Sequence, residues 1–195
     1  MTDTDRNALA DCYLGGKLLI ATPSIGDPRF DRAVILLCDH SDEHAMGIIL
    51  NKPATGLRLP DLYLRLDVET EAKVPDRCVL LGGPVERERG FVLHTDDFEA
   101  GGSTLPVSDT IGLTATKDAL EAIASHHPPR LSVLALGYAG WGAGQLEEEL
   151  TSNAWLVAEP DEGLVFGGEN DVKWEQALEQ IGITPEHLSS LSGHA

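Results

Sequence analysis

The stretch from Leu131 to Glu159 constrains the fold more than any other part of this 195-residue chain. A short apolar run is followed by Gly137-Tyr-Ala-Gly-Trp-Gly-Ala-Gly-Gln145, then by a glutamate-rich segment and a second apolar run. This order predicts a strand, a glycine-rich turn, a helix and another strand. Glycine permits positive φ angles and a close approach of the backbone to other groups. We therefore expect a tightly specified corner, which either locks strand to helix or forms a binding surface.

Charge limits the partners that the chain can bind. It has 14 lysines and arginines against 32 aspartates and glutamates, for a formal net charge of -18. A surface this acidic repels phosphate backbones, so direct nucleic-acid binding is not expected. Because 42% of the residues are hydrophobic, the chain can bury a core. We expect a single domain over residues 1–195, in which residues 1–13 form a flexible N-terminal segment.

Cysteine spacing and hydropathy indicate the compartment. The three cysteines lack CxxC spacing, and no basic and apolar leader stands at the N-terminus. This combination is typical of a reduced, cytoplasmic protein. No apolar run approaches the roughly 18 residues of a membrane-spanning helix, so no membrane partner is expected.

Hydrophobic patterning predicts more strands than helices. Strands are expected over residues 17–22, 33–38, 45–50, 78–81, 91–94, 111–114, 131–137, 155–159 and 163–166. Helices are expected over residues 57–66, 116–125 and 171–181 and from residue 184. Thr116 is the expected N-cap of the second of these helices. Hairpin-like pairs mixed with helical crossovers predict an α+β fold with a mixed sheet.

Three blocks of the sequence resemble one family. The first runs from Ala21-Thr-Pro23 to Asn51-Lys-Pro53, and the second from Gly82-Gly-Pro84 to His94. The third is the run from Leu136 to Glu147, followed by Asn153 and Trp155. Together they are similar to the AlgH/YqgE family, an uncharacterised bacterial group named after a proposed regulator of alginate synthesis. The resemblance extends from about Leu14 to the C-terminus.

The resemblance implies an α+β fold in which a complex, bifurcated mixed β-sheet is folded into a pseudo-barrel with flanking helices. It also implies an effect on transcription without a demonstrated DNA-binding surface, and it supplies no established catalytic residues. We therefore expect a regulator of transcription that acts through an unknown protein partner or small molecule, rather than through direct DNA binding. Enzymatic activity is not expected, and no cofactor is assigned.

Histidines are the candidates for metal binding and general-base catalysis. His40 and His44 lie among acidic residues, but a hairpin turn favours solvated side chains over a zinc site. Residues 126–127 are two histidines that stop a helix, where positive charge is favourable. His94 ends a strand and could act as a base, although a strand-end histidine bonded to backbone is more common. The sequence thus predicts neither a metal site nor a catalytic residue.

Two further motifs give weak signals. Cys38 and Cys78 both lie in apolar strands, where a buried cysteine behaves as an inert hydrophobic residue rather than a nucleophile. Gly82-Gly-Pro84 could cradle an anion, but it lacks the dinucleotide-binding and P-loop patterns. A β-bulge or a tight turn is the commoner use of such a segment.

The glycine- and aromatic-rich corner is the best candidate for a ligand groove. Its tryptophans and tyrosine can line an apolar surface, and neighbouring amides can direct hydrogen bonds into it. The groove candidates are Asn51, Gly83, His94, Tyr138, Trp141 and Gln145. The competing interpretation is that the tryptophans pack the core and the glycines make room for them. A small-molecule-binding protein or an enzyme that uses this groove is the alternative function.

Overall fold

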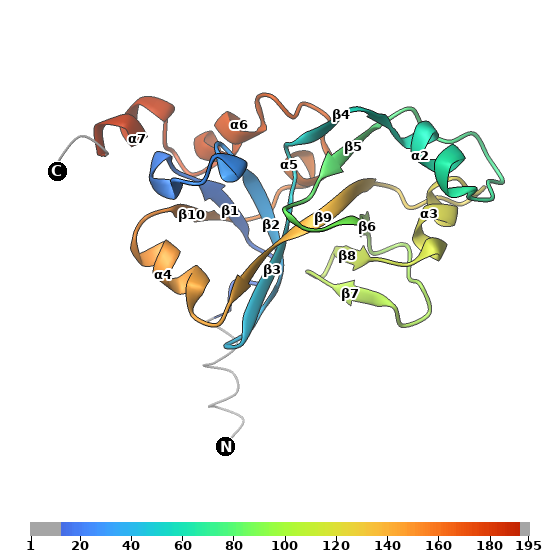
Figure 1. Ribbon diagram of the computed structural model, residues 1–195, viewed down its shortest axis with the longest axis horizontal. Coiled ribbons are helices and arrows are strands. Elements are labelled where there is room, and N and C mark those ends of the chain that lie inside the picture. Colours follow the sequence, from blue (N-terminus) through green and yellow to red (C-terminus); the bar gives the residue numbers. More distant parts are fainter. Residues whose placement is uncertain (1–12, 192–195) are drawn as a thin grey trace, which may run out of the picture.

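The computed structural model describes residues 13–191, so all but Tyr13 of the predicted flexible N-terminal segment lies outside the described residues (Figure 1). The strands are β1 (Leu18–Ala21), β2 (Val34–His40), β3 (His44–Ile49), β4 (Pro53–Arg58), β5 (Cys78–Leu81), β6 (Val85–Thr95), β7 (Thr104–Pro106), β8 (Ile111–Thr114), β9 (Ser132–Gly142) and β10 (Trp155–Ala158). The helices are α2 (Leu59–Leu66), α3 (Lys117–Ile123), α4 (Gln145–Thr151), α5 (Glu162–Phe166), α6 (Lys173–Gln180) and α7 (Pro185–Leu191), with 3-10 turns η1 (Pro23–Ile25) and η2 (Pro28–Phe30).

Strand β9 holds the two halves of the sheet together (Figure 1). Its C-terminal part pairs with β3, from Ala139 opposite Gly47 to Gly142 opposite His44. Its N-terminal part pairs with β6 on one side and runs parallel to β5 on the other. The strand order is β10-β1-β2-β3-β9-β6-β8-β7, and β4 joins through β5. The predicted α+β fold with a bifurcated sheet is confirmed, and the sheet is a mostly antiparallel, curled half-barrel.

Glycines permit the backbone crossing at which the sheet divides. Gly82 donates its N–H to Leu136 and accepts from Ile49, so it bridges β9 and the end of β3. A Cβ atom on Gly83 would overlap the backbone of Tyr138, and one on Gly82 would overlap the carbonyl of Gly137. Only glycine allows two backbones to approach this closely. The Gly82-Gly83 pair is therefore a crossing point between strands.

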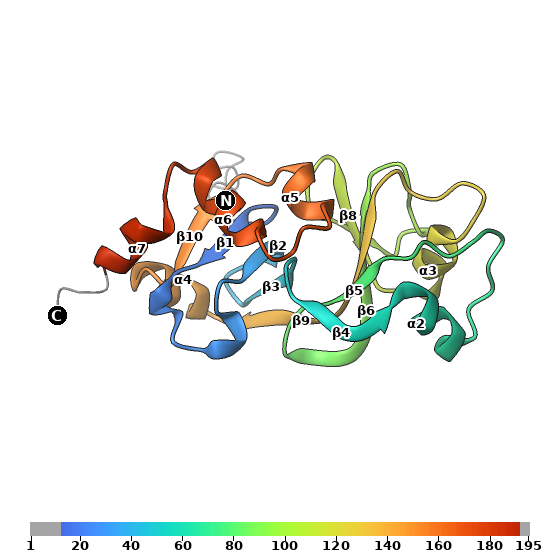
Figure 2. The same ribbon diagram turned by 90° about the horizontal axis from the view of Figure 1, so that it is seen from above.

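Helices cover both faces of the sheet. Figures 1 and 2 show α4, α6 and α7 at one end of the molecule and α2 and α3 at the other. In β1, Leu18 and Ile20 pack towards α5 and α6, whereas Leu19 and Ala21 pack towards α4. This double burial explains why the first strands are continuously apolar. At the other end, α2 and α3 are joined by a hydrogen bond from the Tyr63 hydroxyl to the carbonyl of Leu120.

The central stretch of the chain differs from its predicted structure. The glycine-rich segment predicted to be a turn continues as strand to Gly142, and the turn is confined to the residues just before α4. Pairing with β3 supplies the hydrogen bonds that keep this segment extended. Gly137 has φ of 71° at the point where β9 passes from one half of the sheet to the other. The glycines thus shape a strand rather than end one.

A second correction concerns residues 163–166, which were expected to form a strand and instead lie in helix α5. Asp161 is its N-cap, because Oδ1 accepts from the N–H groups of Gly163 at 2.8 Å and Leu164 at 3.3 Å. A short apolar run has no periodicity that separates strand from helix. The aspartate that caps the N-terminus therefore favours the helix.

Smaller differences lie at element boundaries. Strand β6 begins at Val85 instead of residue 91, β4 follows directly from Pro53, and β7 was not predicted. Thr116 occupies the N-cap position of α3, but its hydroxyl makes no capping hydrogen bond. Among the residues that the structure describes, no helix has the length and apolar character needed to cross a bilayer.

Candidate functional site

Trp141 and Gln145, two of the six groove candidates, lie together at the corner between β9 and α4. Trp141 is 5% exposed and packs edge-to-face on Trp155, with 6.0 Å between ring centroids. Both indoles donate to Glu149 Oε2, at 2.9 and 2.7 Å. Gln145 accepts from the N–H of Gly142 and donates to Glu149 Oε1. The glutamate of α4 thus binds the helix to the strand.

Gly83 and Tyr138 form a second, separate pair. They lie at the backbone crossing, and the Tyr138 ring packs edge-to-face on Phe91 at 5.7 Å. Tyr138 belongs to the cluster that faces α5 and α6, whereas Trp141 belongs to the cluster that faces α4. The two aromatic rings of β9 therefore point to opposite faces of the sheet.

Asn51 and His94 have different partners again. Asn51 accepts from the N–H of Val34 at 3.0 Å and donates to the carbonyl of Arg32 at 2.8 Å, which ties the end of β3 to the start of β2. His94 is fully buried in β6, where its ring nitrogens contact the carbonyl of Thr95 and the hydroxyl of Thr114, both at 2.9 Å. The structure therefore does not bring the six candidates together in one groove.

Both histidines lie at the β2–β3 hairpin as expected, but His40 is buried at the end of β2 rather than solvated, because it has partners on both ring nitrogens. The N–H of Leu14 donates to His40 Nδ1 at 3.0 Å, so the ring proton is on Nε2, which donates to Glu147 at 2.8 Å. His44 is exposed and pairs with Asp39. Within residues 13–191, no three histidine, cysteine, aspartate or glutamate side chains gather in a way that would hold a metal ion.

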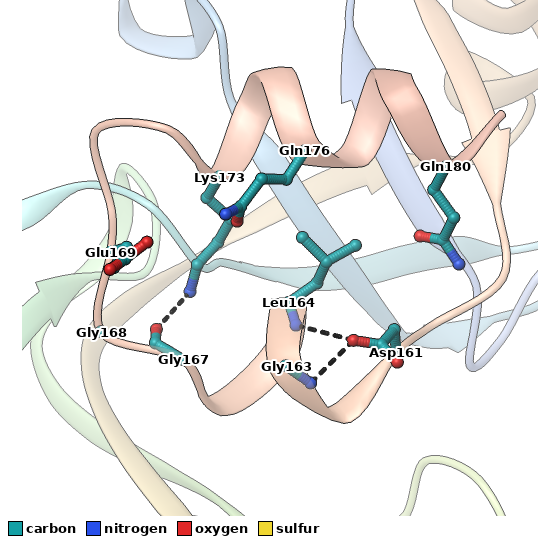
Figure 3. Close-up of a pocket in the computed structure, with 9 residues that line it drawn as sticks. All are labelled: Asp161, Gly163, Leu164, Gly167, Gly168, Glu169, Lys173, Gln176 and Gln180. Carbon is teal, nitrogen blue, oxygen red and sulfur yellow. Dashed lines mark hydrogen bonds between the residues drawn. The ribbon is translucent and has the colours of Figure 1, made fainter. Parts of the chain in front are cut away.

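A cavity that the sequence did not suggest lies between α5 and α6 (Figure 3). It has a volume of about 510 Å³, and Asp161, Glu169, Lys173, Gln176 and Gln180 contribute its polar lining. Figure 3 shows the Lys173 side chain extending from α6 towards the segment that follows α5. Side chains of both charges and two amides therefore line the cavity together with the apolar side chain of Leu164.

Lys173 is the most unusual group in this cavity. It is only 2% exposed, and its Nζ donates to the carbonyls of Leu50 at 3.0 Å and Gly167 at 2.8 Å. Burial lowers the pKa of Lys173 to about 8. Gly167 is the C-cap of α5, where partial negative charge favours a cation. This lysine joins α5 to the end of β3 and also places an amine with a depressed pKa beside the cavity.

A second cavity, of about 440 Å³, is lined in part by Gly167, Gly168 and Asn170. Arg58, Arg77, Cys78, Ser132 and Asn170 contribute polar groups to it. The sequence predicts a buried, inert Cys78, but the residue is partly exposed because β5 is a short strand near the margin of the sheet. In the sequence, the charged Arg77 immediately before Cys78 is the feature that indicates exposure at this end of the strand. Cys38 is buried in β2 as expected, and burial raises the pKa of its thiol.

Comparisons with known proteins identify the family. A family model described as AlgH-like matches residues 18–186. The chain belongs to the AlgH-like family. It is 55% identical over 184 residues to a UPF0301 protein of Caulobacter vibrioides, with 94% of each chain covered. It is 50% identical over 201 residues to a UPF0301 protein of Methylobacterium sp. 4-46, covering 100% of this chain and 96% of the relative.

Two solved structures share the fold of this AlgH-like chain. The solution structure of AlgH from Pseudomonas aeruginosa matches with a TM-score of 0.74 and 37% identity, over 94% of this chain and 96% of that one. A crystal structure of a protein from Corynebacterium diphtheriae matches with a TM-score of 0.67 over 89% and 90% of the two chains. At 19% identity, the second likeness concerns the fold alone. The family is of uncharacterised function, so the comparisons do not assign a role to either cavity.

Proposed function

We propose that this AlgH-like protein is a cytoplasmic regulator of transcription that binds a partner protein and does not contact DNA itself. The observation that carries the proposal is the charge of the chain, -18, together with the engagement of its cations. Carboxylates pair with Lys17, Arg29, Arg58, Arg89, Lys117 and Arg130.

Direct DNA binding would require these cations to neutralise phosphates. Affinity for DNA comes largely from lysines and arginines that displace counterions from the backbone. Here the acidic groups outnumber the basic ones, and several of the basic groups already have a carboxylate partner. A basic or apolar protein surface suits this charge better than a nucleic acid does.

Helix α2 offers an apolar surface for such a partner. Leu59, Leu62 and Tyr63 face the core, whereas Leu64 is 83% exposed and Leu66 is also exposed. Large apolar side chains at the tip of a molecule contribute to protein interfaces once a partner removes them from water. We place the partner contact at α2 on this ground.

The test measures transcription and DNA binding separately. Transcript levels are compared between a strain that lacks the protein and the same strain complemented with wild type, Leu64→Asp or Leu105→Asp. Leu105 is the control, because it is an exposed leucine in β7 rather than in α2. We expect wild type and Leu105→Asp to restore the transcripts and Leu64→Asp to fail, while the purified protein shifts no DNA at moderate salt. Tight, sequence-selective binding of DNA by the purified protein would contradict the proposal.

Small-molecule binding is a second candidate, favoured by Lys173 beside the cavity between α5 and α6. A cavity lined by apolar side chains and a few directed polar groups suits a small ligand. Native mass spectrometry of protein purified from its own cells tests this function. A bound small molecule should be present in wild type and in Lys117→Met, whose lysine is exposed on α3, and absent in Gln176→Ala. Equal occupancy in the two variants would count against this cavity as the site.

A further inference from the structure

The cavity at β5 differs in charge from the rest of the molecule. Its titratable lining consists of Arg58, Asp76, Arg77 and Cys78. Two arginines and one aspartate leave a positive balance of one charge, in a chain whose net charge is -18. Arg58 donates to Asp76 at 2.6 Å, and Arg77 donates to the carbonyl of Ser132 at 3.1 Å. The second guanidinium therefore has no carboxylate partner among the described residues.

Cys78 lies on the wall of this positive cavity. The Asn170 amide donates to its sulfur at 3.5 Å. The Arg58 and Arg77 guanidinium groups line the same cavity as the sulfur. Positive charge and partial exposure are the conditions under which a cysteine is reactive. Cys38 has neither, because it is buried among apolar side chains.

Ser132 places an unpartnered hydroxyl in the same cavity. It is 7% exposed and lines the cavity at the start of β9. Its carbonyl accepts from Arg77, and its hydroxyl makes no hydrogen bond to the residues that the structure describes. The hydroxyl oxygen is accessible from the cavity, unlike that of Thr116, so it is free to bond to a polar group of a ligand.

We propose that this cavity binds an acidic, low-molecular-weight disulfide of the glutathione class and that Cys78 forms a mixed disulfide with it. The Cys78 thiolate attacks one sulfur of the bound disulfide. The new bond joins the Cys78 sulfur to that sulfur as the old sulfur–sulfur bond breaks. The second half leaves as a thiolate, which takes a proton from water. Cys78 is oxidised and the released half is reduced, so no further reactant is needed.

The lining explains why the disulfide should be acidic. A carboxylate on the bound half can pair with the Arg77 guanidinium, and such charge-assisted contacts are among the stronger hydrogen bonds. A neutral disulfide lacks this contact, and a cationic one is repelled by Arg58 and Arg77. Over most of the surface the preference would be reversed, because the protein is acidic. The charge preference of Cys78 is therefore a signature of this cavity.

The first experiment locates the modification. Native full-length protein is treated with oxidised glutathione, and the modified cysteine is identified by peptide mass spectrometry. We expect glutathione on Cys78 in wild type and in Cys38→Ser, its release by a reducing thiol, and its loss in Cys78→Ser. Modification of Cys12 or Cys38 with Cys78 left free would overturn the proposal.

The second experiment measures charge preference. Rates of Cys78 modification are compared for oxidised glutathione, neutral hydroxyethyl disulfide and cationic cystamine. We expect oxidised glutathione to react fastest, and Arg77→Gln to slow that reaction about three- to tenfold while changing the neutral reaction less. Arg89→Gln is the matched control, because it removes the same charge from an exposed arginine outside the cavity. Cystamine reacting as fast as glutathione disulfide, or equal effects of both arginine variants, would contradict the assigned site. Circular dichroism of each variant verifies that it is folded.

Discussion

Trp141 and Trp155 share one hydrogen-bond acceptor. Their indole nitrogens, from β9 and β10, both donate to Oε2 of Glu149 in α4. The two rings also pack edge-to-face, with planes 77° apart. A single carboxylate therefore satisfies two buried donors and ties one helix to two strands that are not neighbours in the sheet.

Replacing that carboxylate should loosen the corner. Glu149→Ala leaves two buried N–H groups without an acceptor, and each such group costs about 1–3 kcal/mol. We expect the free energy of unfolding to fall by about 2–4 kcal/mol in urea titrations. Glu148→Ala, an exposed glutamate in the same helix, is the control and should change it by less than about 0.5 kcal/mol. Equal effects of the two substitutions would show that Glu149 does not hold α4 in place.

The crossing of Gly83 over Tyr138 should tolerate no side chain. A methyl group at Gly83 overlaps backbone atoms that cannot move without breaking strand pairing. Gly83→Ala should therefore destabilise the fold by about 3 kcal/mol or more. Gly142→Ala is the control, since a Cβ there meets nothing within 4 Å. Thermal unfolding followed by circular dichroism compares the two, and a similar melting temperature for both would be inconsistent with a tight crossing.

Thr116 is a site where a polar group can be removed at no cost. Its buried hydroxyl has no hydrogen-bond partner among the described residues. Thr116→Val keeps the shape and removes the unsatisfied group, so stability should stay the same or rise by about 1 kcal/mol. Thr22→Val provides the contrast, because the Thr22 hydroxyl donates to the carbonyl of Asn153 at 2.7 Å and accepts from Ser24. Denaturant titration should show a loss for Thr22→Val alone; a comparable loss at Thr116 would reveal a hidden partner.

The buried amine of Lys173 should make stability depend on pH. Burial lowers its pKa to about 8 in the folded protein, from an ordinary value of 10.5. Between these values the unfolded chain binds more protons than the folded one, so the free energy of unfolding rises with pH. From about pH 7 to about pH 9, wild type should gain about 1 kcal/mol relative to Lys173→Met. Lys117→Met, which removes an exposed lysine, should show no such change relative to wild type. A pH-independent difference for Lys173→Met would mean that the amine titrates normally.

Local patterns in the sequence were sufficient for the fold class, most strands and the amphipathic helices. The apolar run of residues 33–38 and the spacing of leucines before Leu66 are local signals. They predict a strand and a helix because the periodicity of neighbouring residues indicates the type of element. The net charge is also known from the sequence, because it does not depend on how the chain folds. Family membership also followed from the sequence, since the glycine and aromatic run is long and unusual.

The tertiary structure alone decided what that run does. Its glycines suggested a turn, but pairing with β3 keeps the segment extended to Gly142. Trp141 and Tyr138 lie three residues apart, so the alternation of side chains along β9 puts them on opposite faces once the segment is known to be a strand. The cavity at β5 likewise arises where segments distant in sequence meet, since Cys78 meets Asn170 there. The cavity between α5 and α6 is formed by consecutive segments, but its lysine is buried because it reaches Leu50. Burial and charge at such places are properties of packing, so they can be known only once the chain has folded.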